Sequence, residues 1–205
     1  MVRYIFNDVF RVQCYAKYGE GDHKSSLANN EVEWRESRSR IGAATEHYFV
    51  KTHNHPEDDH PAIVLVRDPR ATFVSYWHYL NELEGQSISL EAVANGLCAY
   101  GEWTAFYDAW QPQNRANTLL LRYEDFLAAP DRCIDKIAGF TGLAPIGKWN
   151  DNFSEMNALD PQFFRVGNNE ANFAELPPPL EKLILDRCAP MMAKLGYQTP
   201  LSFST

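Results

Sequence analysis

Short apolar runs along the chain are separated by longer segments in which apolar residues recur every three or four positions. Three such runs predict strands, at residues 48–50, 62–66 and 118–121. They are nearly free of polar side chains, which is typical of strands that helices cover on both faces of a parallel sheet. The alternation of these runs with helical segments predicts an α/β fold.

Five segments show the helical spacing of apolar residues, at about 2–12, from 69 onward, 89–110, 130–140 and 180–195. Asp68 is the expected N-cap of the second helix, because aspartate followed by Pro69 is a common helix start. Gly142 is expected to end the helix at 130–140. Residues 19–46 are polar and mixed, and they predict a loop with a short helix.

Polar residues with useful chemistry follow each predicted strand at once. Lys51 and His53 follow the first run, Arg67 follows the second, and Arg122 and Tyr123 follow the third. Ligands of parallel α/β sheets bind at the carboxyl ends of the strands. The shared position of these residues therefore predicts a ligand site.

Arg67 allows two interpretations. At the end of a buried strand its guanidinium offers a bidentate fork to a phosphate, and Ser75 lies two helical turns further on. Asp68 is expected to take up the free amides of the helix start, so a phosphate would depend on side chains. The alternative is a surface arginine paired with Asp68, with Ser75 as a small packing residue.

The other candidates are equally open from the residues alone. His53 is a candidate general base, and Lys51 beside it can stabilise developing negative charge; alternatively, both belong to a polar loop end. Tyr123 can stack on a nucleotide base or simply pack. Arg165 and Gly167 pair a cation with a flexible backbone, which suits either a phosphate-gripping loop or an ordinary turn.

The stretch HNHPEDDH, residues 53–60, contains three histidines and three carboxylates that could hold zinc. Pro56 interrupts it, and its spacing departs from the HxHxDH pattern of metallo-hydrolases. A solvated acidic loop without a metal is the favoured interpretation. The alternative is a metal-dependent hydrolase that uses His53, His55 and His60.

The composition limits the class of protein. The 205 residues are 45% hydrophobic and 22% charged, which predicts one globular domain over 1–205. The net charge of −8 argues against nucleic-acid or membrane-surface binding, so an anionic ligand must meet a local basic cluster. Neither a membrane span nor a secretory signal is visible. The scattered cysteines predict reduced core thiols in a cytoplasmic protein: Cys14, Cys98, Cys133 and Cys188.

The ordered blocks VKTH, VLVRDPRATFVSYWHY, LLLRYEDF, FFRVG and MMAKLGY resemble the sulfotransferases that use 3′-phosphoadenosine-5′-phosphosulfate (PAPS). The resemblance covers nearly the whole chain, and RDPR…VSYWHY is its specific part. It implies a P-loop-NTPase-like, three-layer α/β fold with a parallel sheet flanked by helices. It also implies transfer of a sulfuryl group from PAPS, without a metal, to a hydroxyl or amine of a small-molecule or glycan acceptor.

The resemblance further implies roles for individual residues. His53 would deprotonate the acceptor, and Lys51 would contact the sulfuryl group in transfer. The 3′-phosphate would be held by the end of the second strand, the following helix and a C-terminal loop, and the adenine would lie near the end of the third strand. Arg67 ends the second strand, Ser75 lies in the following helix, and Arg165 and Gly167 lie in the C-terminal loop. Tyr123 follows the third strand, near the expected place of the adenine.

Two departures from the family accompany the resemblance. The family's first strand and its 5′-phosphosulfate loop, of the PKSGTTW or PRSGNTW kind, have no counterpart, so the chain is expected to begin just after them. In the C-terminal loop, where the family reads FFRKGxxGDW, Val166 stands in place of the lysine. The alternative function is therefore an inactive, truncated remnant that still binds the nucleotide.

Overall fold

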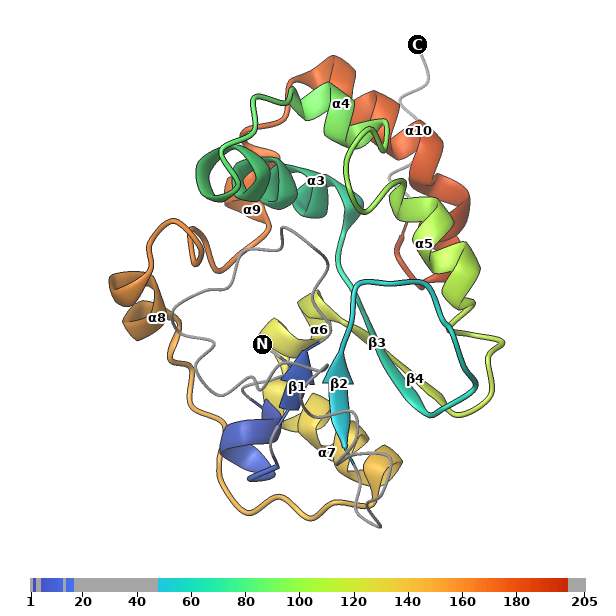
Figure 1. Cartoon of the computed structure of the whole chain (residues 1–205), viewed down its shortest axis with the longest axis vertical. Coiled ribbons are helices and arrows are strands. Elements are labelled where there is room, and N and C mark those ends of the chain that lie inside the picture. Colours follow the sequence, from blue (N-terminus) through green and yellow to red (C-terminus); the bar gives the residue numbers. More distant parts are fainter. Residues whose placement is uncertain (1, 3–4, 13, 17–47, 199–205) are drawn as a thin grey trace. The chain divides into compact units, whose positions relative to one another are not determined.

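The computed structural model describes residues 2, 5–12, 14–16 and 48–198 (Figure 1). The loop predicted at 19–46 lies outside this part of the chain. The chain divides into two compact units: unit 1 is Met1–Asn54 with Asp125–Phe163, and unit 2 is His55–Glu124 with Phe164–Thr205. The single domain over 1–205 stays a prediction.

Unit 2 contains the parallel strands β3 (Ala62–Val66) and β4 (Thr118–Arg122), which confirm two of the predicted apolar runs. They pair in register, with Ala62 opposite Thr118 at one end and Val66 opposite Arg122 at the other. Because the strands are parallel, Arg67 and Tyr123 follow the same end of the pair.

Helix α3 (Pro69–His78) begins where the sequence predicts. The Asp68 side chain accepts a hydrogen bond from the backbone N–H of Arg70 at 2.9 Å, which confirms the N-cap. Phe73 and Val74 are buried. The helix continues into a π-helical turn, η3 (Tyr79–Leu83). A buried strand and a capped helix therefore fix the backbone on both sides of Arg67.

The single helix predicted over 89–110 is wrong, because this segment forms two helices, α4 (Leu90–Ala94) and α5 (Trp103–Trp110). Between them the backbone φ angles of Gly96 and Gly101 are 73° and 64°. These left-handed values cannot continue an α-helix, and glycine adopts them without steric cost. The apolar spacing runs on across the break because both helices bury side chains in the same core.

Replacing Gly96 by alanine is expected to destabilise the fold strongly. The positive φ alone costs about 1–2 kcal/mol for a residue with a Cβ. In addition, the new Cβ would lie 2.5 Å from Glu102 Cγ and 2.9 Å from Glu102 N. Gly101→Ala is the matched control, since its φ is +64° but its Cβ would meet nothing within 4 Å. Urea unfolding should show the larger loss for Gly96→Ala, and equal losses would contradict the close approach.

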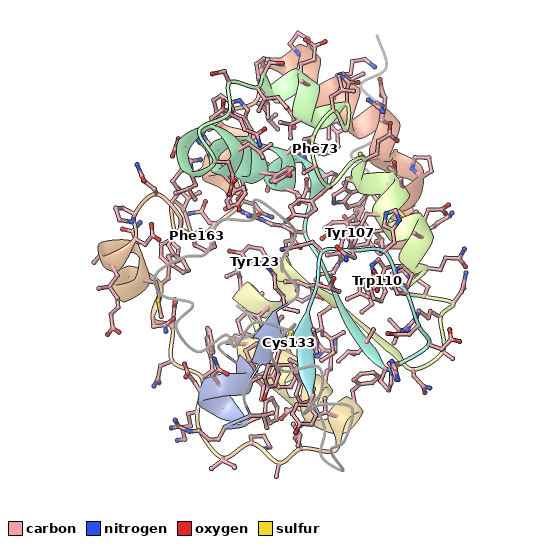
Figure 2. The ribbon with its side chains drawn as sticks, viewed as in Figure 1. Phe73, Tyr107, Trp110, Tyr123, Cys133 and Phe163 are labelled. Carbon is pink, nitrogen blue, oxygen red and sulfur yellow. The ribbon has the colours of Figure 1, made fainter. Side chains whose placement is uncertain are left out.

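The core of unit 2 is shared by β3, α3, α5 and α10 (Pro178–Lys194), the last of which confirms the predicted C-terminal helix. Tyr107 of α5 ties this core to the strands, because its hydroxyl donates to Leu65 O at 3.1 Å (Figure 2). The short helix α9 (Glu170–Phe173) packs beside α3 (Figure 1). Through α9, the segment that follows Phe164 is attached to the helix that follows Arg67.

Unit 1 contains β1 (Cys14–Ala16) and β2 (Phe49–Lys51), which pair in parallel with Ala16 opposite Lys51. Strand β2 confirms the first predicted apolar run, whereas β1 is absent from the sequence prediction. The helix predicted over 2–12 is wrong in length. Val2 is helical, Ile5–Val9 form a π-helical turn, η1, and Arg11 then adopts a positive φ of 55°.

Helix α6 (Tyr123–Ala128) begins within the RYEDF block. Helices α7 (Pro130–Thr141) and α8 (Phe153–Leu159) follow it along the chain. Gly142 ends α7 with a φ of 74°, as predicted.

The four cysteines form no disulfide, and burial raises the pKa of the Cys188 thiol to about 12. Within the described residues, none of the helices has the length and apolar character that a membrane crossing requires.

Candidate functional site

Arg67 and Tyr123 meet at the carboxyl ends of β3 and β4. The Arg67 guanidinium carbon lies 4.6 Å from the centre of the Tyr123 ring, a cation–π distance. Figure 2 labels Tyr123 at the point where β4 passes into α6. The parallel register places these two residues side by side, so the sequence prediction that strand ends converge is confirmed for this pair.

The C-terminal loop, defined here as residues 164–169, closes on the same two side chains. Asn169 Oδ1 accepts a hydrogen bond from Arg67 Nε at 2.8 Å, and Asn168 O accepts a longer one from Arg67 Nη2 at 3.4 Å. The Tyr123 hydroxyl donates to Gly167 O at 3.3 Å. The structure thus brings together Arg67, Tyr123 and Gly167, three of the residues expected to hold the cofactor.

Glu124, for which the sequence analysis predicts no role, anchors this arrangement. Its Oε1 accepts hydrogen bonds from the Asp68 backbone N–H at 2.9 Å and from Asn169 Nδ2 at 2.7 Å. Its Oε2 accepts one from the Tyr197 hydroxyl at 2.8 Å. One carboxylate therefore joins the β3–α3 turn, the C-terminal loop and the chain after α10.

Arg70, and not Arg67, forms the ion pair with Asp68. Arg70 Nη2 lies 2.9 Å from Asp68 Oδ2, and Arg70 Nη1 lies 2.9 Å from Glu181 Oε1. Hydrogen bonds to these two carboxylates raise the pKa of Arg70. Asp68 forms its ion pair with Arg70, so the interpretation of Arg67 as the partner of Asp68 is wrong.

The Arg67 guanidinium is a partly desolvated cation. Burial lowers the pKa of Arg67, while the nearby groups Tyr123, Glu124, Asp68 and Tyr197 act in the opposite direction. An arginine stays protonated even so, and a partly desolvated guanidinium gains more from an anion than an exposed one does. Burial together with the Glu124 carboxylate raises the pKa of Tyr197, so this phenol remains a donor at neutral pH.

Arg165 takes part in a different cluster. Its Nη2 donates to Glu175 Oε1 at 2.7 Å and lies 3.5 Å from Asn172 Oδ1. His78 bridges two carboxylates, with Nε2 2.6 Å from Glu175 Oε2 and Nδ1 2.5 Å from Glu82 Oε1. This cluster ties the segment around α9 to α3, and the phosphate-binding role expected of Arg165 stays a prediction.

Glu175 should make the stability of the chain depend on pH at the acid end. Burial acts to raise the pKa of Glu175, but hydrogen bonds from Arg165 and His78 outweigh it, so the pKa lies below the ordinary 4.5. A depressed pKa contributes stability above the unfolded value, and this contribution is lost as the pH falls through the folded value. Urea unfolding should therefore show wild type more stable than Glu175→Gln at pH 7, with the gap closing below pH 4.5. A gap that is constant with pH would contradict this.

The contacts described above do not test the roles predicted for Ser75, Lys51 and His53. Ser75 is exposed on α3, and its partnership with Arg67 stays a prediction. Lys51 is the last residue of β2 in unit 1, and His53 lies exposed two residues beyond it. The carboxyl end of β2 therefore carries the two residues expected to act in catalysis.

The histidine-rich stretch does not gather into a metal centre. The His55 ring lies 6.0 Å from the Phe106 ring, and His60 Nδ1 lies 3.2 Å from Asp58 Oδ2. Across the residues that the structure describes, no three His, Cys, Asp or Glu side chains group so as to hold a metal ion. No described contact therefore favours the metal-dependent hydrolase.

The chain is similar to several known sulfotransferases. Cytosolic sulfotransferase 16 of Arabidopsis thaliana is 34% identical over 122 residues, which make up 54% of this chain and 36% of that protein. This chain thus matches about a third of the length of that relative. The structure of mouse sulfotransferase SULT7A1, solved with PAP, aligns with a TM-score of 0.63 at 19% identity. The alignment covers 90% of this chain and 85% of the SULT7A1 chain.

Retinol dehydratase, solved with androsterone and PAP and also with retinol and PAP, gives a TM-score of 0.60 at 20% identity. The alignment covers 85% of this chain and 61% of that protein. These similar structures confirm the predicted P-loop-like α/β fold. The family model for the sulfotransferase domain matches residues 13–163. Since that match spans well over half of the sequence, the chain belongs to the sulfotransferase family.

Proposed function

We propose that this chain is a sulfotransferase that moves the sulfuryl group of PAPS to a hydroxyl or amine acceptor. The observation that carries the proposal is the meeting of Arg67, Tyr123 and the C-terminal loop at the ends of β3 and β4. A cation, an aromatic ring and a loop in this position suit a nucleotide that carries a phosphate. The similar structures that were solved with PAP support PAPS as this nucleotide.

In the proposed reaction, each of these residues has the role that the family resemblance implies. The acceptor oxygen or nitrogen attacks sulfur, the bond between sulfur and the bridging oxygen breaks, and PAP leaves with that oxygen. His53 takes the proton of the acceptor, and Lys51 stabilises the negative charge on the sulfuryl group during its transfer. Arg67 and Tyr123 hold the nucleotide, with Ser75, Arg165 and Gly167 completing its site. Such a transfer depends mainly on positioning and on stabilising charge.

Turnover of labelled PAPS tests the proposal. Androsterone and retinol are the first acceptors to try, because they are bound in the retinol dehydratase structures, and a phenol and an amine complete the panel. The label is expected on at least one acceptor, with one PAP released per transfer. Binding of PAP without any turnover would favour the inactive remnant, and no binding of PAP in calorimetry would overturn the proposal.

A further inference from the structure

The side-chain amide of Asn169 separates the Arg67 guanidinium from the Glu124 carboxylate. We infer that Asn169 and Glu124 are positioning residues, which orient Arg67 toward the 3′-phosphate of the cofactor without neutralising its charge. The inference rests on the proposed function and adds two residues to it. Both residues belong to unit 2, as Arg67 does.

The orientation of the Asn169 amide is fixed by its two neighbours. Arg67 can only donate hydrogen bonds and the ionised Glu124 can only accept them. Asn169 Oδ1 must therefore face Arg67 Nε, at 2.8 Å, and Nδ2 must face Glu124 Oε1, at 2.7 Å. The residue is 7% exposed, so water competes poorly for either bond. Neither alanine nor aspartate can make both bonds.

Glu124 is held too firmly to swing toward Arg67. Besides Asn169, it accepts hydrogen bonds from the Asp68 backbone N–H and from the Tyr197 hydroxyl. A direct salt bridge would occupy the guanidinium fork and compete with a phosphate. Within the described part of the chain, no carboxylate lies within ion-pair distance of Arg67. The amide spacer thus transmits the position of Glu124 to Arg67 while the positive charge stays available.

The contacts also select the edge of the guanidinium that a ligand can use. The Nε–H and one Nη2–H point to the C-terminal loop, and the Tyr123 ring covers one face. The described residues make no hydrogen bond to Nη1. The edge formed by Nη1 and the second hydrogen of Nη2 therefore remains for bidentate binding of an anion.

The test compares the affinity for PAP with that for 5′-AMP, which lacks the 3′-phosphate, by calorimetry on the full chain. Asn169→Ala is expected to lower the PAP affinity about 10-fold and to leave the AMP affinity within about twofold, because only the phosphate contact loses its orientation. Asn169→Asp is expected to lower the PAP affinity further, because its carboxylate neutralises Arg67 and faces Glu124. Tyr197→Phe, which removes one donor to Glu124, should cause a smaller loss in the same direction.

Asn81→Ala is the matched control. Asn81 also makes hydrogen bonds through both ends of its amide, in its case to backbone groups of Trp77 and Ile88, but it makes no contact with the Arg67 cluster. This variant should lose stability and keep the wild-type ratio of PAP to AMP affinity. An unchanged ratio in both Asn169 variants and in Tyr197→Phe, or an equal loss for both ligands, would overturn the inference. The proposed function would survive that result if wild type binds PAP and Arg67→Ala weakens the binding.

Discussion

Replacing His53 by alanine is expected to slow sulfuryl transfer by about 100- to 10,000-fold, the usual range for loss of a general base. The acceptor must lose its proton as it attacks sulfur, and His53 is the side chain expected to take that proton. The affinity for PAP should stay within about twofold of wild type, because the proposed role involves the acceptor and not the nucleotide. Initial rates with labelled PAPS, together with calorimetric titration of PAP, measure the two quantities separately.

His60→Ala is the matched control for His53, since it removes an exposed histidine of the same HNHPEDDH stretch that is paired with Asp58. Its rate should equal that of wild type. If the rates of His53→Ala and His60→Ala were both unchanged, the assignment of His53 as the base would be wrong. If both fell together with PAP affinity, the loop would act on folding rather than on proton transfer.

Replacing Arg67 by alanine is expected to weaken PAP binding by about 10- to 150-fold. This corresponds to about 1.5–3 kcal/mol for the loss of hydrogen bonds to a charged group. The loss should be large because the guanidinium is partly buried and Asp68 forms its ion pair with Arg70 instead. Calorimetric titration of PAP into wild type and variant measures the change.

Arg115→Ala provides a close structural match for Arg67→Ala. The Arg115 guanidinium also lies over an aromatic ring, that of Trp110 at 5.4 Å, and donates to the backbone oxygens of Asp58 and His60. However, it lies near the amino end of β4, where its Nη1 donates to Thr118. PAP affinity should therefore survive in Arg115→Ala, and an equal loss in both variants would show that general destabilisation is the cause.

The sequence predicts those elements whose causes are local. Strand β3 is apolar over its full length and β4 is apolar at its three central residues, and Asp68 with Pro69 fixes the start of α3 through one cap hydrogen bond. The break between α4 and α5 escapes prediction because the apolar spacing continues across it. The positive φ angles of Gly96 and Gly101, which cause the break, leave no mark on that spacing.

The candidate site likewise contains residues that the sequence predicts and residues that it does not. Arg67 and Tyr123 can be found from the sequence because parallel strands bring their carboxyl ends together. The contribution of Asn169 could not be foreseen, since it lies 102 residues from Arg67 and 45 from Glu124 and acts only through both. The one available signal was Val166. Because it stands in place of the family's lysine, the loop needs other polar groups to bind the phosphate. The pairing of Arg165 with Glu175 likewise depends on the packing of α9 beside α3.

The most direct test of the account is a thermodynamic cycle of four titrations, with PAP and 5′-AMP binding to wild type and to Arg67→Ala. Wild type should bind PAP at least about 10-fold more tightly than AMP, and the variant should lose most of that preference while its AMP affinity hardly changes. Such a result would assign the preference to contact between Arg67 and the 3′-phosphate. An equal loss for both nucleotides, or a wild type that does not distinguish them, would contradict the account.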